Sequence, residues 1–160
     1  MKNILCFVLL CCSLPSIGQT FLIKEGKLSE TTADSTLDYG SPLPHFYSVD
    51  GKYPTGSAAV LKDVKAFLAK QKIDPSGSGY ITYRFIIDTT GHIGNKVKVM
   101  QTDEEYKARS FEKPLIEALG AFIQTLDKWK IARYRTGEAL EYIAFITFKM
   151  KNGKVINIIP

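Results

Sequence analysis

The spacing of apolar residues predicts two amphipathic helices. After Lys52-Tyr53-Pro54, apolar residues recur at intervals of three and four, which places them on one stripe of a helix. We predict that this helix begins with Ser57 as its N-cap and runs to about Gln71. Its stripe consists of Val60, Leu61, Val64, Phe67 and Leu68.

A second stripe predicts a helix from about Phe111 to Lys128. Ser110 is a candidate cap, and Pro114 falls within the first turn. Backbone N–H groups in the first turn have no acceptor within the helix, so a proline is tolerated there. The apolar positions of this helix are Leu115, Ala118, Leu119, Phe122 and Leu126. Between the two helices the chain changes to a two-residue period.

The two-residue period predicts four strands. Residues 80–88 and 93–100 alternate between apolar and polar and are separated by Thr89-Thr90-Gly91, which predicts a hairpin. Residues 141–150 are apolar on both faces, and residues 155–159 form a short final strand. Asn152-Gly153 between them is the strongest short-range hairpin signal.

The order helix, strand, strand, helix, strand, strand defines the fold class. Hairpins give antiparallel pairing, so we predict an α+β domain over residues 51–160, with a small antiparallel sheet and two helices packed on one face. The irregular, basic stretch 129–138 interrupts the pattern before the third strand.

Residues 1–18 predict a cleaved secretory signal peptide. Lys2 precedes an apolar run from Ile4 to Leu14, and the small residues Ser16 and Gly18 place the cleavage site after Gly18. All three cysteines lie in this segment, so the mature chain would have no disulfide and no thiolate chemistry. The alternatives are a retained membrane anchor and lipidation. We therefore expect a periplasmic or exported protein, or else an inner-membrane protein facing the periplasm.

Charge separates the mature chain into two parts. Residues 19–50 carry two basic and five acidic residues, a net charge of −3, and lack sustained periodicity, so we interpret them as a flexible arm. Residues 51–160 carry 18 basic and 11 acidic residues, a net charge of +7. A solvated, lysine-rich surface is the simplest interpretation of that excess.

The sequence contains no arrangement typical of an enzyme. His45 and His92 have no second ligand at metal-binding spacing, and the glycine-rich run 76–79 precedes a strand, whereas a phosphate loop opens a helix. Asp103-Glu104-Glu105 is typical of a solvated loop. We therefore predict no catalytic residue, no metal and no cofactor, with a hydrolase-like activity as the remaining enzymatic alternative.

Binding through the backbone is the function that the pattern favours. A basic domain with several tyrosines resembles a nucleic-acid-binding sheet, but Tyr83 and Phe85 alternate as core residues do, and an exported protein does not meet nucleic acid. An apolar strand at a sheet edge can instead pair with an extended peptide. The competing interpretation is an edge covered by the arm or by a second copy. The predicted binding residues are Tyr142, Ile143, Ala144, Phe145, Ile146, Thr147 and Phe148, with Arg133 and Arg135 facing an acidic partner.

The pattern as a whole resembles a known family. Tyr53-Pro54, the hairpin Gly79-Tyr80-Ile81-Thr82-Tyr83-Arg84-Phe85-Ile86-Ile87-Asp88 with Gly91-His92-Ile93, and Trp129 after the second helix are similar to the C-terminal domain of TonB-type energy transducers. The similarity covers about residues 50–150. It implies a TonB C-terminal-like fold without cofactor and a protein or peptide partner, such as the N-terminal segment of an outer-membrane transporter, bound by strand addition.

Two features decide how much of that function we expect here. The start predicts a cleaved signal, and residues 19–50 contain only Pro42 and Pro44, so a long proline-rich spacer is missing from the arm. We therefore predict an exported, non-enzymatic binding domain. The alternative is a membrane-anchored transducer that retains its N-terminal segment. A homodimer formed by strand exchange at Asn152-Gly153 is a further alternative for the oligomeric state.

Overall fold

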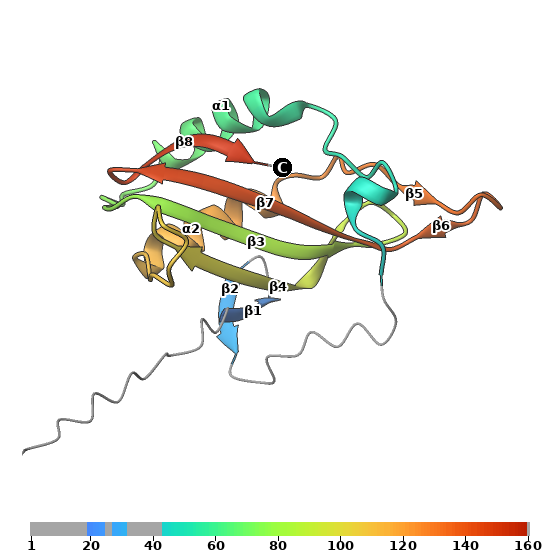
Figure 1. The fold of residues 1–160 in the computed structure, drawn as a ribbon, viewed down its shortest axis with the longest axis horizontal. Coiled ribbons are helices and arrows are strands. Elements are labelled where there is room, and N and C mark those ends of the chain that lie inside the picture. Colours follow the sequence, from blue (N-terminus) through green and yellow to red (C-terminus); the bar gives the residue numbers. More distant parts are fainter. Residues whose placement is uncertain (1–18, 25–26, 32–42, 160) are drawn as a thin grey trace, which may run out of the picture.

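An antiparallel sheet forms the centre of the molecule. The computed structural model describes residues 19–24, 27–31 and 43–159. Its larger sheet has four strands in the order β4-β3-β7-β8, extended beside β4 by β1 and then β2 (Figure 1). These strands are β1 (Gln19–Lys24), β2 (Lys27–Thr31), β3 (Gly79–Ile87), β4 (Ile93–Thr102), β7 (Tyr142–Lys151) and β8 (Lys154–Ile159).

The remaining elements are short or helical. Two helices, α1 (Gly56–Leu68) and α2 (Lys113–Gln124), accompany the sheet, and a 3₁₀ turn, η1 (Phe46–Ser48), precedes α1. Strands β5 (Ala132–Arg133) and β6 (Ala139–Leu140) form a separate two-stranded sheet. The α+β class, the antiparallel sheet and the packing of two helices on it confirm the fold predicted from the sequence.

One face of the sheet carries the core. Alternate residues of β3 are fully buried, and their partners in β7 are buried with them, as are Val97 and Val99 of β4, because paired strands share the same pleat. Tyr83 lies at the centre, where its hydroxyl donates a 2.6 Å hydrogen bond to the Ile116 carbonyl of α2. Phe148 packs edge-to-face against both Tyr83 and Phe122 of α2. These contacts attach α2 to the middle of the sheet.

The helices are shorter than the periodicity predicts. Helix α1 begins at Gly56 with Thr55 as its N-cap and ends three residues before Gln71. Helix α2 begins at Lys113, after Glu112 as N-cap rather than Ser110, and Pro114 lies in its first turn as predicted. The observed helix ends differ from the predicted ones because a helix ends where its caps form and where the chain must leave the sheet. The apolar stripe contains no information about either.

The segment predicted as a flexible arm contributes to the packed structure. Strands β1 and β2 form an antiparallel pair, and β1 also pairs with β4 from Gln19 opposite Val99 to Leu22 opposite Lys96. Phe46 of η1 belongs to the hydrophobic core, so packing begins before residue 51. The predicted signal peptide, residues 1–18, lies outside the described residues. Within the described ranges no helix is long and apolar enough to cross a membrane.

Strand β8 forms one border of the sheet. It pairs with β7 from Ile159 opposite Thr147 to Lys154 opposite Lys151, with an irregularity beside Met150. The backbone N–H of Ile158 donates to the side-chain oxygen Oδ1 of its neighbour Asn157 at 2.9 Å. That donor is therefore satisfied by the strand itself.

Hydrogen bonds to the loop before β3 hold the turn between β7 and β8 in place. Asn152 and Gly153 both have positive φ, 48° and 75°, as the predicted Asn-Gly hairpin turn requires. The N–H of Gly153 donates to the Gly77 carbonyl at 2.8 Å, and the N–H of Asn152 donates to Ser78 Oγ at 3.1 Å. The hairpin tip is thus bonded to the loop that leads into β3.

Candidate functional site

Strand β7 is not the edge strand that the sequence analysis expected. It pairs with β3 along its whole length from Tyr142 to Met150, and β8 pairs with its other side from Thr147 to Lys151. The expectation failed because the border of a sheet depends on which distant strands pair, and β8 folds back onto β7. Among the described residues, only the first half of β7 has no strand on the side away from β3.

A one-residue interruption of the hydrogen-bond ladder lies in that first half. The N–H of Ile143 donates to the Pro44 carbonyl at 2.9 Å, and Thr147 lies opposite Ile159, the last residue of β8. Backbone groups alternate direction along an antiparallel strand, so Phe145 also directs its N–H and C=O away from β3. Within the part of the chain that the structure describes, no strand pairs with Phe145 on that side. We call this interruption, residues 144–146, the β7 notch.

The predicted binding residues divide between the two faces of β7. Phe145 and Thr147 are half-buried on the face away from the helices, where Thr147 Oγ1 lies 2.9 Å from Thr82 Oγ1. Ile143 is buried on that face. The side chains that lie in the core and so cannot reach a partner are Tyr142, Ala144, Ile146 and Phe148. Only the backbone of the strand and the side chains of Phe145 and Thr147 therefore remain available.

The two predicted arginines lie on the small hairpin of β5 and β6. This hairpin projects beyond the end of the sheet where β7 begins (Figure 1). Arg133 is exposed, and its Nη1 donates to the Gly137 carbonyl of the same hairpin at 2.8 Å. Arg135 is exposed in the turn. Both arginines lie near the start of β7 in the chain, and among the described residues no hydrogen bond or ion pair joins either of them to the notch.

Tyr142 has a structural role beside the notch. Its side chain is fully buried, and its hydroxyl donates to the Lys130 carbonyl at 2.8 Å. Its ring lies so close to Gly51 that a Cβ at residue 51 would overlap it. Tyr142 therefore ties both the segment before α1 and the segment after α2 to the sheet. Lys130 and Asp50, which belong to these two segments, form an ion pair.

Burial raises the pKa of the Tyr142 hydroxyl to about 12. A folded-state pKa above the unfolded value of about 10 means that the stabilisation is complete below about pH 10 and is lost as pH rises from 10 towards 12. We expect the free energy of unfolding, measured with urea, to fall between about pH 10 and about pH 12, and to fall less in Tyr142→Phe. Tyr83, whose pKa burial also raises, contributes equally in both proteins. An identical fall in both would contradict this assignment.

An aromatic pocket adjoins the β7 notch. It has a volume of about 200 Å³ and lies among residues from the segment before α1, from the first turns of α1, from Trp129, and from the ends of β7 and β8 that flank the notch. Tyr53 and Trp129 meet at 5.1 Å between ring centroids, and Phe46 meets Phe145 edge-on at 5.0 Å. We define this aromatic pocket by Phe46, Tyr53, Ser57, Trp129, Phe145 and Ile158.

Two buried polar atoms near this pocket have no partner. Trp129 is 7% exposed and lines the pocket, yet its Nε1 has no acceptor among the described residues. The Nδ1 of His45, beside the bridge to Ile143, is likewise buried without a partner there. Buried polar groups are nearly always hydrogen-bonded, so such atoms require an explanation. No local pattern in the sequence indicated either atom, because their burial depends on contacts between distant segments.

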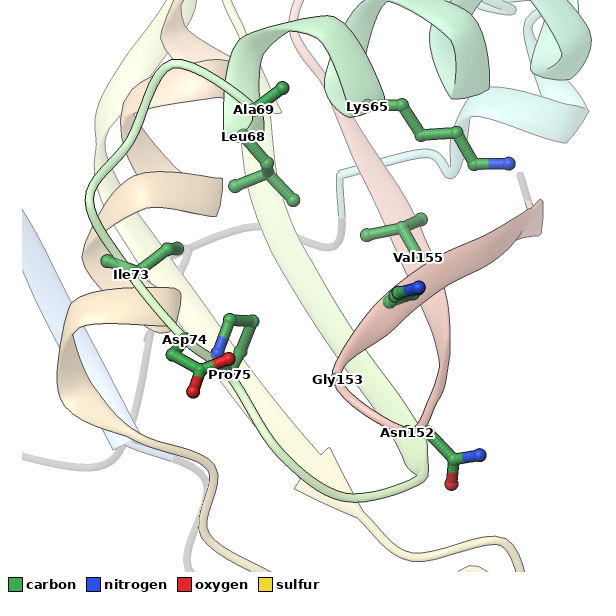
Figure 2. A pocket seen from close by; sticks show the side chains of 10 residues that line it. Lys65, Leu68, Ala69, Ile73, Asp74, Pro75, Asn152, Gly153 and Val155 are labelled. Carbon is green, nitrogen blue, oxygen red and sulfur yellow. The ribbon is translucent and has the colours of Figure 1, made fainter.

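A second, larger hollow lies at the opposite end of β8. It has a volume of about 590 Å³ and is enclosed by the end of α1, the following loop and the β7–β8 turn (Figure 2). Figure 2 shows Leu68, Ile73 and Val155 around the space, with Lys65 at its rim. Among its described lining residues no buried side-chain polar atom lacks a partner. This hollow therefore offers an apolar surface without the unsatisfied groups found at the notch.

His92 and Asp103, which the sequence analysis considered, lie in turns, whereas His45 forms an isolated bridge with Ile143. Asp88 Oδ1 accepts hydrogen bonds from the backbone of Thr90 and His92 at 2.8 and 3.0 Å, closing the β3–β4 turn. Asp103 Oδ1 accepts from the backbone of Glu105 and Lys107, both at 2.9 Å. In the described ranges no group of three His, Cys, Asp or Glu residues could hold a metal ion.

Comparisons with known proteins identify no family for this chain. No family model, curated protein or solved structure gave a significant match.

Proposed function

We propose that this chain is an exported, non-enzymatic binding domain of the TonB C-terminal type that holds a protein or peptide partner by backbone pairing at the β7 notch. The observation that carries the proposal is that, among the described residues, no strand pairs with Phe145 on the side away from β3, between two positions that are paired there. A buried or half-buried N–H and C=O without partners is costly, and an extended segment supplies both partners at once. The partner of the outer-membrane transporter type comes from the resemblance alone.

The size of the notch limits what binds there. Ile143 and Thr147 are four residues apart, which corresponds to about 13 Å at the usual rise of a strand. A partner therefore pairs through about three extended residues and leaves the sheet on either side. The outer border of β8 is less suited, because Asn157 already satisfies the N–H of Ile158.

A matched pair of substitutions tests the proposal. Phe145→Pro removes the outward N–H, whereas Phe145→Ala removes the same ring and keeps the N–H. Proline is tolerated where the strand N–H makes no ladder bond, so both variants should fold. With the full chain as bait in cell-envelope extract, we expect Phe145→Pro to capture about tenfold less partner than Phe145→Ala, as the loss of about 1.4 kcal/mol predicts.

Circular dichroism melts provide the control for folding. Equal capture by the two folded variants would reject the notch as the binding site. If Phe145→Pro does not fold, amide hydrogen exchange of the wild-type protein decides instead. The Phe145 amide should then exchange faster than those of Ile143 and Thr147, and captured partner should slow it; protection of Phe145 in the free protein would contradict the proposal.

A further inference from the structure

We infer that the face of the sheet away from the helices binds the anionic surface of a lipid bilayer. The observation that carries this inference is the sign of the charges in the sheet. Strands β3, β4, β7 and β8 contain no Asp or Glu, and all of their charged residues are basic. These residues are Arg84, Lys96, Lys98, Lys149, Lys151 and Lys154. The inference does not rest on the proposed function, which concerns the backbone at the β7 notch.

All of these basic residues lie on the same face of the sheet. Along each strand they alternate with buried core residues, as Lys98 does with Val97 and Arg84 with Tyr83. Successive side chains of a strand point to opposite faces, so the basic side chains point away from the core and its helices. Lys154 lies opposite Lys151 and therefore shares its face. We call this surface the basic face.

Protection of a sheet border does not explain the basic face. Lysines on a border strand deter pairing with another chain, and Lys154 of β8 fits that role. Arg84, however, lies on β3 between β4 and β7, and the register places it directly opposite Lys98. Like charges directly opposite each other destabilise a sheet. Sequences depart from such local rules mainly at functional sites, and a bound anionic surface would offset the repulsion.

The layout of the basic face favours a bilayer over a single extended chain. Neighbouring strands lie about 4.8 Å apart, and the cations are spread over four of them. They therefore form a two-dimensional array, whereas an extended polypeptide offers its charges along one line. A layer of anionic headgroups is itself two-dimensional and can meet the whole array at once.

Exposed aromatic and apolar side chains lie among the cations. Tyr80 shares the basic face with Lys149, whose Nζ lies 5.7 Å from the centroid of the Tyr80 ring. The exposed ring of Tyr106 stacks on Tyr80 at 5.0 Å between centroids. Met100 and Ile159, opposite Thr82 and Thr147, are also exposed on this face. Tyrosine and apolar side chains beside lysine are typical of surfaces at the membrane interface.

Cosedimentation of the full chain with vesicles tests the inference. One set of vesicles is phosphatidylcholine alone, and the other is an equal mixture of phosphatidylcholine and phosphatidylglycerol. The readout is the ratio of the two partition coefficients, because any contribution of the apolar run 4–14 is common to all variants. We expect Lys96→Gln/Lys98→Gln/Lys149→Gln to lower this ratio about a hundredfold, since each basic residue near an anionic surface contributes about fivefold.

The matched control removes the same charge from the helix side of the sheet. Lys62 and Lys65 are exposed on α1, and Lys70 is exposed just after it. The variant Lys62→Gln/Lys65→Gln/Lys70→Gln should lower the ratio by less than about fivefold. Raising the ionic strength from about 0.1 M to about 1 M should abolish the preference of the wild-type chain for anionic vesicles. Equal losses in the two triple variants, or no such preference, would overturn the inference.

Acetylation of lysines, measured by mass spectrometry, gives a second test that needs no substitution. Anionic vesicles should protect Lys96, Lys98 and Lys149 and leave Lys62 and Lys65 reactive. Equal protection on the two sides of the sheet would contradict the inference even if the triple variant did not fold. Soluble polyglutamate is the final probe. Protection by polyglutamate without protection by vesicles would assign the basic face to an acidic protein and reject the lipid surface.

Discussion

Replacing Gly153 by alanine is expected to lower the free energy of unfolding by about 3 kcal/mol or more. Gly153 has φ of 75°, where a side chain costs about 1–2 kcal/mol. A Cβ there would also overlap the Pro75 carbonyl oxygen, and relieving such overlap costs about 1–3 kcal/mol more. The same shift would disturb the hydrogen bond from Gly153 to Gly77. Urea unfolding monitored by circular dichroism measures the change.

Gly137→Ala is the matched control for the backbone effect. Gly137 also has a positive φ, 95°, but nothing lies within 4 Å of the position where its Cβ would be. We expect this variant to lose only about 1–2 kcal/mol. Losses of equal size in the two variants would show that the hairpin tip does not pack against the loop before β3 as described.

Replacing Phe148 by alanine should have the largest effect on stability, about 4 kcal/mol, as is usual for a fully buried Phe. Its side chain is 0% exposed and contacts Tyr83 and Phe122, so removing the ring leaves a cavity at the junction of β3, β7 and α2. Unfolding in urea again provides the measurement.

Phe145→Ala is the control on the opposite face of the same strand. Phe145 is half-buried and contacts Phe46 at the sheet border, so we expect a loss of about 1 kcal/mol. A one-residue slip of β7 would exchange the faces of these two rings. A larger loss at Phe145 than at Phe148 would therefore contradict the register of the sheet.

Local features of the fold were predictable from the sequence because local chemistry decides them. The turn at Gly91 and the turn at Asn152-Gly153 both need residues that tolerate positive φ, and the structure has φ of 86° and 75° at the two glycines. The alternation in β3 likewise identified its buried face, since its polar residues all fall on one side.

The strand order was not predictable in the same way. Residues 142–148 are apolar on both faces, so the pattern could not distinguish a central strand from a border strand or identify the face that packs on the helices. That decision depends on β3, about 60 residues earlier, and on where β8 stops along β7. The sequence therefore correctly predicted that these residues form a strand, but the expectation that this strand lies at the edge of the sheet was wrong.

The candidate site was predictable only in part. Phe145 belongs to the predicted binding strand, but the pocket beside it joins Phe46, Tyr53 and Trp129, which come from separate segments. Phe46 was assigned to the arm because its neighbourhood lacks periodicity. A single 3₁₀ turn that buries one ring gives no repeating signal, and the cluster Pro44-His45-Phe46-Tyr47 was the only hint available.

The side chain of Asn157 has a consequence for how copies of this protein behave towards one another. Proteins with bare border strands stack into continuous ribbons, since each molecule offers a template for the next. Here the amide oxygen of Asn157 occupies the donor that a neighbouring molecule would need on Ile158. Ribbon growth through that donor is thereby disfavoured, because a second copy would first have to displace the amide oxygen of Asn157.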